Sequence, residues 1–555
     1  MVNDRNGWFR SGTPWIWLNA AAVSTSLIMV TGLLALIAVK GLGHFWPASV
    51  WEFQYRGSDG TVQQLLGEVQ DSEEVSAARM RDAGEALPED APEVVERYLL
   101  KTGNRDLSGL DFRWIVEPAI SERRRPRDAV VLERMEWGNF YGFLERLLED
   151  GKVVAEGEGA WPELQSRLKR VRELRRRIRH LEKTEIGGVN YRLERLRLER
   201  RRLELEGEDT PAALAKIENR RKQLQAQFAG LQKELEAQYR DIRRDSMIMS
   251  VMGGRQLSLP LQQVVRAYRP NDMNLLQKTG FYFSKLWEFV SEEPREANTE
   301  GGIFPAIFGT VMMVLLMSVL VTPFGVVAAV YLREYARQGP LTRLIRIAVN
   351  NLAGVPSIVY GVFGLGFFVY FLGGNIDRLF FPESLPAPTF GTPGLMWASL
   401  TLALLTVPVV IVATEEGLAR IPRSIREGSL ALGATKAETL WRTVLPMASP
   451  AMMTGLILAI ARAAGEVAPL MLVGVVKLAP TLPVDGNPPF IHLDRKFMHL
   501  GFHIYDVGFQ SPNVEAARPL VYATALLLVL VIVILNLAAI AIRNRLRERY
   551  RALEQ

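Results

Sequence analysis

An arginine and a glutamate lie inside one of the most apolar stretches of this 555-residue sequence. Arg462 and Glu466 are the only charged residues between Ser449 and Val476, and on a helix their spacing would place them on one face, where they can pair. Ionised groups in a bilayer are costly and usually face protein or a water-filled path. The pair therefore predicts either a structural ion pair between helices or an arginine presented to an anion, with Glu466 orienting it. A planar guanidinium can bind two oxygens of a tetrahedral oxyanion at once.

Two amides precede a break in another apolar run. Asn350 and Asn351 are followed by Gly354 and Pro356, which suggest a broken helix with a short amphipathic piece ahead of it. Backbone groups freed by such a break are tolerated in a membrane only where protein or a cavity covers them. The segment is either a proline kink packed against a neighbouring helix or, as we predict for both amides, part of a substrate path.

A polar segment with helical periodicity lies between two apolar runs. From Ile421 to Leu445 apolar and charged residues alternate at helical spacing, with Pro422, Gly433 and Pro446 as interruptions. Such a segment is either an amphipathic helix on the membrane surface or a coupling helix that docks into a groove on another protein.

The same segment resembles the last cytoplasmic loop of ABC importer membrane subunits, which carries the pattern EAA, three residues, Gly, nine residues, Ile-x-Leu-Pro. Glu427, Gly433, Leu445 and Pro446 are in register with that pattern. The small residues Gly433 and Ala434 would allow a close approach at a turn, and Glu427 could hydrogen-bond across it. The resemblance implies that these five residues couple the membrane part to an ATPase.

Several chemistries are excluded or made improbable by residues that the sequence lacks. There is no G-x-x-x-x-G-K-[ST] phosphate loop, so ATP and Mg²⁺ would be used by a partner ATPase, and we expect no cofactor on this chain. The absence of cysteine excludes disulfides and Cys-based metal sites. His492, His499 and His503 are interpreted as surface histidines, so we expect no metal site.

The average composition of the chain combines two regions of different character. The chain is 48% hydrophobic and 23% charged with a formal net charge of +6. Residues 303–542 are strongly apolar, whereas residues 50–300 are rich in Arg and Glu. The positive excess comes mainly from Arg clusters beside apolar runs, which does not favour a nucleic-acid partner.

Six apolar runs are long enough to cross a bilayer as helices. The first is too long for the apolar region of a signal peptide, so we interpret it as an uncleaved span. The runs are Trp15–Val39, Ile303–Leu332, Ile347–Asn375, Leu395–Thr414, Ser449–Val476 and Leu520–Ile542. Basic residues concentrate in the loop 333–346, in the loop after Glu416 and in the tail, which places these segments in the cytoplasm. The stretches 43–302, 373–394 and 477–518 then face outward.

The outward stretch 43–302 reads as an α+β module. Short β-rich runs such as RWIVEP, DAVVLERM and GKVVAEGE precede a segment rich in Leu, Arg and Glu. In residues 161–245 apolar side chains recur every three or four positions, which predicts an antiparallel coiled-coil hairpin inserted into the module. Thr210 and Pro211 would start its second arm, and Gly187-Gly188 would break its first arm. Such a hairpin is most often a structural or docking element.

Together these elements predict an all-α polytopic membrane protein of about six spans with an outward α+β insertion. The predicted divisions are a cytoplasmic leader and first span (1–42), the insertion (43–302), a permease-like membrane domain with a coupling loop at 415–446 (303–542) and an Arg-rich cytoplasmic tail (543–555).

Three further segments indicate which kind of ABC importer subunit the chain resembles. NNLAGVPSIVYGVFGLG, ARAAGEVAPLMLVG and FMHLGFHIYDVGFQSPN resemble the permease subunits of phosphate-specific ABC importers, over about residues 303–542. The long outward insertion departs from the shortest members of that family. The resemblance implies a type I importer permease fold in a bacterial inner membrane.

The resemblance also implies partners. They are a homologous second permease, two ATPase subunits, a periplasmic phosphate-binding protein and inorganic phosphate, with no enzymatic activity of this chain alone. In that family the residues matching Arg462 and Glu466 are associated with transport. Two alternatives stay open: a permease for another oxyanion such as sulfate or molybdate, and a membrane-bound sensor with a coiled-coil periplasmic domain.

Overall fold

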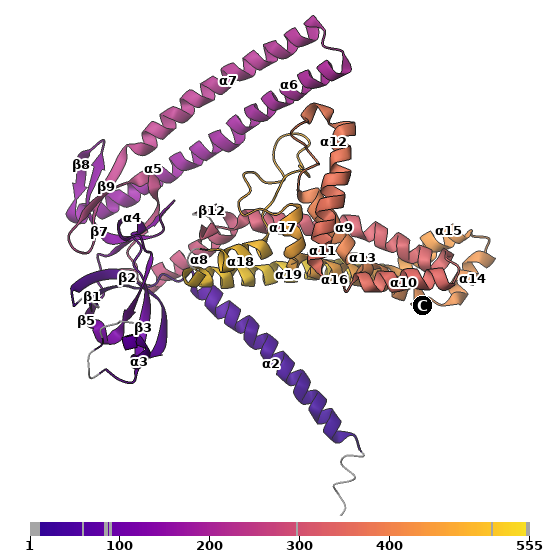
Figure 1. The fold of residues 1–555 in the computed structure, drawn as a ribbon, viewed down its shortest axis with the longest axis horizontal. Coiled ribbons are helices and arrows are strands. Elements are labelled where there is room, and N and C mark those ends of the chain that lie inside the picture. The colour runs from indigo at the N-terminus through magenta and orange to yellow at the C-terminus, as the bar shows by residue number, and fades with distance from the viewer. Residues whose placement is uncertain are drawn as a thin grey trace, which may run out of the picture.

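The computed structural model describes residues 11–57, 60–82, 87, 91–295, 298–511 and 514–550, with side chains in the last range from 517 to 548. The predicted leader up to residue 10 and the end of the tail after residue 550 lie outside these residues. Two large antiparallel sheets, a two-stranded one formed by β12 (Pro294–Arg295) and β13 (Glu300–Gly301), a long helical hairpin and a group of apolar helices make up the described chain (Figure 1).

The first sheet follows the first apolar helix. Within the described residues its strand order is β4-β3-β2-β1-β5. The strands are β1 (Val50–Arg56), β2 (Val62–Ser76), β3 (Val94–Lys101), β4 (Phe112–Val116) and β5 (Ile120–Arg124), with the short helices α3 (Ala77–Asp82) and α4 (Arg105–Ser108) between them. Phe53, Tyr55, Leu100 and Ile115 form the core of one face, as the alternation of apolar residues along a strand requires.

The second sheet contains the predicted β-rich runs after residue 128. Its strands are β6 (Val130–Arg134), β7 (Phe140–Glu149), β8 (Lys152–Glu156), β9 (Asp245–Ser250), β10 (Gln256–Pro260) and β11 (Val264–Tyr268). In the described part of the chain their order is β10-β9-β7-β6-β11, and β8 also pairs with β7. Because β8 and β9 both pair with β7, the chain leaves and re-enters the sheet at one place. The hairpin can therefore be inserted there without opening the sheet.

Two long helical arms form the hairpin. The first arm is α5 (Ala160–His180), the π-helical turn η3 (Leu181–Ile186) and α6 (Gly187–Glu206), and the second arm is α7 (Pro211–Arg243). Thr210 caps α7 by accepting a hydrogen bond from the amide of Ala213 (3.3 Å), and Pro211 opens the helix, as predicted. The predicted break at Gly187-Gly188 is wrong: the arm stays helical, because Leu181 and Val189 on either side are buried with Leu231 of the other arm.

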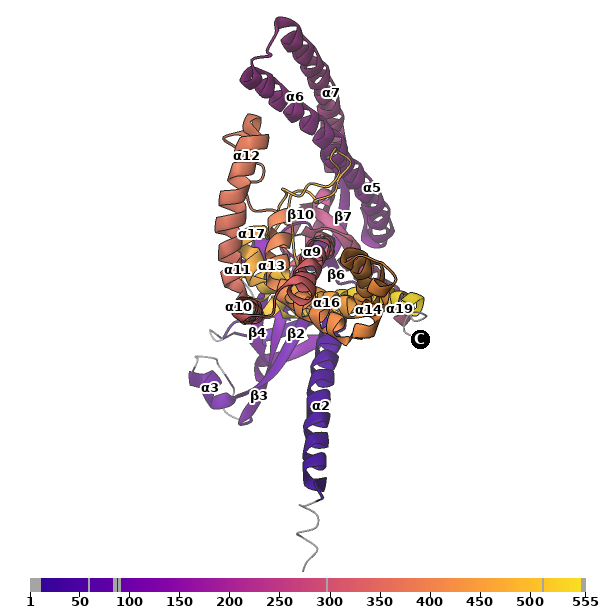
Figure 2. The same cartoon turned by 90° about the vertical axis from the view of Figure 1, so that its right-hand side faces the viewer.

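The predicted apolar seam is buried, but in two different environments. Leu164, Leu168 and Val171 of α5 belong to a core that includes Val130 and Met247 of the second sheet. Farther out, apolar side chains of the two arms pack on each other. The arms run antiparallel in both views (Figures 1 and 2). Supercoiled packing along their whole length stays a prediction.

Within the described residues, six helices are long and apolar enough to cross a membrane. They are α2 (Thr13–Gly43), Phe304–Tyr335, Ser357–Phe380, α13 (Leu395–Arg420), Lys436–Gly465 and Ala517–Glu548. The second contains α9 (Phe304–Val330) and the π-helical turn η6 (Tyr331–Tyr335), the third contains α11 (Ser357–Phe363), η7 (Gly364–Gly373) and α12 (Gly374–Phe380), and the fifth contains α15 (Lys436–Thr439), η9 (Leu440–Val444) and α16 (Leu445–Gly465). The last span is part of α19 (Val514–Tyr550). The predicted number of spans is confirmed.

Two predicted spans have different ends. The third starts at Ser357 rather than Ile347, because residues before the Gly-Val-Pro break form a separate amphipathic helix, α10 (Pro340–Leu352). The fifth ends at Gly465 and does not reach Val476, because the backbone turns extended at Glu466. The remaining short helices are α8 (Leu275–Ser291), α14 (Arg423–Ala431), α17 (Ala468–Val473) and α18 (Leu500–Phe509).

Four of the apolar helices share one core. Met313 of α9, Leu402 of α13, Ala459 of α16 and Ala539 of α19 are buried in it. By contrast, α2 touches α19 only near its end, where a Cβ on Gly41 would lie 2.9 Å from the backbone nitrogen of Ala523. The rest of α2 extends away from the other helices in both views (Figures 1 and 2).

Candidate functional site

Two apolar segments are interrupted, and their interruptions lie side by side. Helix α16 ends at Gly465, and α17 starts at Ala468, after two intervening residues of which Glu466 has an extended backbone (φ −76°, ψ 136°). Helix α11 begins after Pro356. A Cβ on Gly361 of α11 would lie 2.7 Å from the Cα of Pro469 in α17, so these two short helices are in direct backbone contact. Only a glycine allows this approach.

Arg462 and Glu466 pair at this interruption. The distance between Arg462 Nε and Glu466 Oε1 is 3.7 Å, and 33% of the arginine side chain and 19% of the glutamate side chain are exposed. The prediction that both lie on one helical face is wrong, because only Arg462 is helical, in the last turn of α16, and Glu466 lies beyond the helix end. A cation at a helix C-terminus is favoured by the helix dipole.

The geometry of this pair leaves the arginine available. A distance of 3.7 Å exceeds a normal N–H···O bond, and partly exposed ion pairs contribute only about 0–1 kcal/mol to stability. A guanidinium has five N–H donors, most of which such a contact does not use. The arrangement can therefore present Arg462 to an anion while Glu466 limits its movement.

Asn350 and Asn351 lie elsewhere than predicted. Both are exposed near the end of α10, outside the third span. The end of α10 is tied to α11 by the Tyr360 hydroxyl, which donates a hydrogen bond to the carbonyl oxygen of Leu352 (2.7 Å). The break between an amphipathic helix, α10, and α11 is as predicted. A role of the amides in a substrate path stays a prediction.

A tight polar turn follows α13. Helix α14 is followed by Gly433, whose φ of +88° is in the left-handed region that favours glycine. Next to it are Ala434 and then Thr435, which caps α15 in a capping box with Glu438. The predicted hydrogen bond of Glu427 across this turn is wrong. Its side chain is exposed.

The bond across the turn is made by a serine instead. The hydroxyls of Ser429 and Thr439 lie 2.9 Å apart, which ties α14 to α15. Arg426 also pairs with Glu334 at the end of η6 (Nη2–Oε1 2.9 Å), so the turn is fixed to the preceding apolar helix. Leu445 and Pro446 form the first turn of α16, as the polar segment ends. Movement of this turn would therefore be transmitted directly to two apolar helices.

Apolar side chains are exposed on the same turn. Leu432 is 91% exposed and Trp441 is 72% exposed, and Leu430 is also exposed. Leu430 and Leu432 lie at the turn, whereas Trp441 lies in η9 of the fifth apolar helix, and exposed apolar side chains of this kind mark a contact with another protein or with the membrane. Docking of this segment onto another protein was predicted from the sequence, but these apolar residues were not among those named for it.

The three histidines of the loop 477–518 are not on the surface. His492, His499 and His503 are all buried, so the interpretation as surface histidines is wrong. Burial lowers the pKa of His499 to about 3 and the pKa of His503 to about 4, so both are neutral at pH 7. His492 contacts Asp485 (Nε2–Oδ1 2.9 Å). Among the described residues, no group of three or more His, Cys, Asp or Glu side chains could hold a metal ion.

Comparison with protein families gives one match. Residues 321–552 match the family described as binding-protein-dependent transport system inner membrane component. The matched range contains Arg462, Glu466 and the α14–α15 turn. It excludes both sheets and the hairpin.

Several curated relatives resemble the same part of the chain. The phosphate transport system permease protein PstA of Mycobacterium leprae is 35% identical over 219 residues, which cover 39% of this chain and 66% of that protein. The phosphate transport system permease protein PstA 1 of Mycobacterium tuberculosis (strain H37Rv) is 40% identical over 175 residues, or 31% of this chain and 51% of that protein. The chain thus spans about half to two thirds of the length of these relatives.

Solved structures show only a weak similarity to this chain. An inward-facing conformation of the MetNI methionine ABC transporter is 19% identical, with a TM-score of 0.32, and covers 43% of this chain and 94% of that chain. A bacterial ABC transporter involved in the import of alginate is 13% identical, with a TM-score of 0.33, and covers 47% of this chain and 83% of that chain. Overlaps this low carry no weight for function.

Proposed function

We propose that this chain, whose residues 321–552 belong to the binding-protein-dependent transport system inner membrane component family, is the permease subunit of an ATP-driven importer of inorganic phosphate. One observation carries the proposal. The part that matches the family holds an exposed apolar turn at one end of its helices and an arginine at two facing helix interruptions within them. The similarity to permease proteins named for phosphate transport supports phosphate as the substrate.

In this proposal Arg462 meets the oxyanion in the substrate path. Its fork of N–H donors matches two oxygens of phosphate, and the 3.7 Å contact with Glu466 is weak enough to be exchanged for them. Glu466 holds the guanidinium in place when phosphate is absent. Asn350 and Asn351 would contribute amide donors at the end of α10, where the path leaves the membrane.

The polar turn would couple transport to ATP hydrolysis. Leu432 and Trp441 would dock into a groove on an ATPase dimer, which uses ATP and Mg²⁺, while this chain itself binds no cofactor and is not an enzyme. Gly433 and Ala434 would allow the close approach, and Leu445 and Pro446 would pass the movement to α16. For Glu427 the exposed position suggests a contact with the ATPase rather than a bond within the turn.

The proposal includes location and partners. The chain would lie in a bacterial inner membrane, with the insertion 43–302 and its coiled-coil hairpin 161–245 in the periplasm. The leader and first span (1–42), the membrane domain (303–542) and the basic tail (543–555) complete its divisions. A homologous second permease would form the other half of the pore, and a periplasmic phosphate-binding protein would deliver the substrate.

Radiolabelled phosphate uptake tests the proposal. Cells that lack only this subunit should regain uptake when the intact chain is supplied, and an excess of unlabelled sulfate or molybdate should not compete. Competition by sulfate would reassign the substrate to another oxyanion. Purification of the folded chain without any associated ATPase would contradict the importer function itself.

A further inference from the structure

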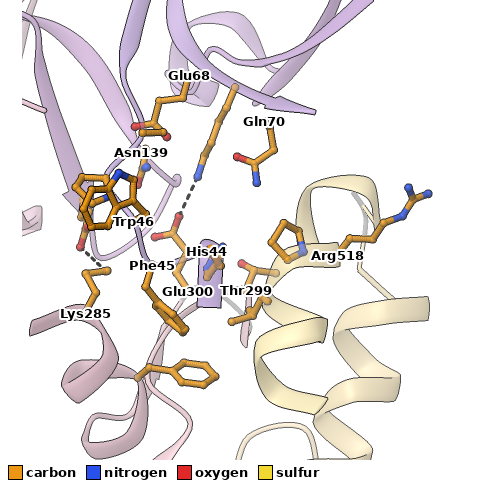
Figure 3. Close-up of a pocket in the computed structure, with 18 of the residues that line it drawn as sticks. His44, Phe45, Trp46, Glu68, Gln70, Asn139, Lys285, Thr299, Glu300 and Arg518 are labelled. Atoms are coloured by element: carbon orange, nitrogen blue, oxygen red, sulfur yellow. Dashed lines mark hydrogen bonds and ion pairs between the residues drawn. The ribbon is translucent and has the colours of Figure 1, made fainter. Parts of the chain in front are cut away.

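A cavity of about 500 Å³ lies where the first sheet meets the apolar helices (Figure 3). Its walls come from β2 and β3, from α8, and from the ends of α2 and α19 that face the sheet. It is therefore at the level where the apolar helices end and the polar module begins. Nothing in the proposed transport mechanism uses it.

The wall on the side of the sheet is acidic. Glu68 of β2 is only 8% exposed, and in the described part of the chain its Oε1 atom has no hydrogen-bond partner. Lys101 stands opposite Glu68 in the β2–β3 pairing, but its Nζ contacts Glu300 instead (4.0 Å). Asp71 also lines this wall. On this wall Lys101 is therefore engaged by Glu300, and Glu68 Oε1 stays without a partner among the described residues.

Deeper in the cavity the charges are balanced. Lys285 of α8 contacts Glu133 (Nζ–Oε2 3.0 Å) and Glu288 (3.4 Å), and Arg295 pairs with Glu288 (2.8 Å). These groups neutralise one another by their own contacts. They therefore do not supply the partner that Glu68 lacks.

The wall on the side of the apolar helices is basic and aromatic. Lys40 lies in the last turn of α2, and Arg518 lies near the start of α19, at the rim of the cavity. Both are exposed, and in the described residues neither has an ion pair. Phe45, Trp46 and Tyr522 continue the lining toward the apolar surface of the helices. Aromatic and basic side chains of this kind are typical of the membrane–water interface.

The charges thus have an order along the cavity, with Lys40 on the membrane side and, on the outer side, a buried carboxylate whose Oε1 atom has no partner among the described residues. We propose that the cavity binds the head group of a phospholipid that carries a primary amine, of the phosphatidylethanolamine type. Its phosphate would lie beside Lys40, its ammonium would donate to Glu68 Oε1, and its acyl chains would follow α2 and α19. The inference does not depend on which substrate the chain transports.

The chemistry of Glu68 favours a primary amine over other head groups. Burial raises the pKa of Glu68 from 4.5 to about 7, while Lys101 and the Tyr141 hydroxyl oppose this rise and Glu133 adds to it. A buried carboxylate needs a proton or a cation with an N–H donor beside it. A choline head group has no N–H to donate, and a glycerol head group offers only neutral O–H donors, which do not balance the charge of the carboxylate.

Lipid competition on the full-length chain tests the proposal. The purified chain would be exposed to equal amounts of phosphatidylethanolamine, phosphatidylcholine and phosphatidylglycerol, and retained lipids would be counted by native mass spectrometry. A hydrogen bond to a charged group should give about 10-fold preference for the ethanolamine lipid over the choline lipid. Soluble phosphoethanolamine should not displace the lipid, because it lacks acyl chains.

Variants identify the atoms involved. Glu68→Gln should abolish the preference, whereas Glu74→Gln, at an exposed position of the same strand, should keep it. Lys40→Gln should weaken retention of both lipids equally, because both carry the phosphate. Equal retention of the ethanolamine and choline lipids by the unaltered chain, or a preference that survives Glu68→Gln, would overturn the proposal. If Glu68→Gln fails to fold, the competition on the unaltered chain decides alone.

Discussion

Replacing Arg462 by glutamine separates a structural ion pair from a substrate contact, because the two roles differ in magnitude. The pair with Glu466 spans 3.7 Å between partly exposed side chains, so its loss should lower the free energy of unfolding by at most about 1 kcal/mol. Loss of charge-assisted hydrogen bonds to phosphate should instead remove about 1.5–3 kcal/mol of binding each. That range corresponds to a loss of about 10- to 100-fold in phosphate uptake efficiency.

The assay compares Arg462→Gln, Glu466→Gln and the double variant. Radiolabelled phosphate uptake and thermal unfolding would be measured for each, with the amount of protein in the membrane as a control. If Arg462 contacts phosphate, Arg462→Gln loses uptake whether or not Glu466 is present, while the unfolding temperature changes by a few degrees at most. Equal losses for both single variants, with no further loss in the double variant, would refute the substrate contact. Normal uptake by Arg462→Gln would refute it as well.

Three further predictions concern stability. Asp245 is buried beneath Arg167, Arg170 and Arg244 at the base of the hairpin. The substitution Asp245→Asn should therefore destabilise that base by about 3–5 kcal/mol, measured as faster hydrogen exchange in α5 and α7. The control substitution Asp241→Asn, at an exposed position, should not. Gly309→Ala would place a Cβ 2.1 Å from the carbonyl oxygen of Met498 and should lower the unfolding temperature. The control Gly366→Ala meets no atom within 4 Å and should leave the unfolding temperature unchanged. Equal effects of the two substitutions would contradict the close packing of Gly309 against Met498. Because the pKa of Glu68 rises from 4.5 to about 7 on folding, the folded chain holds this proton more tightly, and its stability should fall as the pH rises from about 4.5 to 7. In detergent free of amine lipids, Glu68→Gln should remove this slope and gain up to about 3 kcal/mol at pH 8, and an unchanged slope would contradict the assignment.

Local patterns predicted most of the elements. A run of apolar residues long enough to span a bilayer is sufficient to predict a helix, because in lipid the backbone must satisfy its own hydrogen bonds. The cap at Thr210 and several strands of the insertion, such as β4, β6 and β8, were predicted for the same reason: their signals lie within a few residues of one another, whereas β3 was not predicted. The sequence predicted that the hairpin is inserted into the β-containing module. It did not predict that β8 and β9 both pair with β7, which is the strand pairing that permits the insertion.

Some helix ends in the membrane part were not predicted, because contacts distant in the sequence help to set them. Gly465 and Pro469 are local signals for a helix end, but the predicted span ran through them to Val476. The start of α17 is held by Gly361, a residue about a hundred positions earlier, whose missing Cβ admits Pro469. The positions of Arg462 and Glu466 were therefore predicted as a pair but not as a pair across a helix end. By contrast, the break that leaves Asn350 and Asn351 on α10 was predicted from Gly354 and Pro356, which lie within a few residues of it.

The position of the hairpin changes how its removal should be interpreted. Its first arm does not project freely, because the Tyr191 hydroxyl donates to the carbonyl oxygen of Pro488, and Lys183 pairs with Glu293 next to α8. The ring of Tyr191 also packs edge-on to buried His492 (centroids 6.2 Å apart). The arm thus covers the loop that follows α17, and through α17 this loop is joined to the helix interruption at Glu466. Deleting residues 161–245 would uncover this loop, so lost uptake in such a variant would follow from damage to the membrane part even if the hairpin binds no other protein.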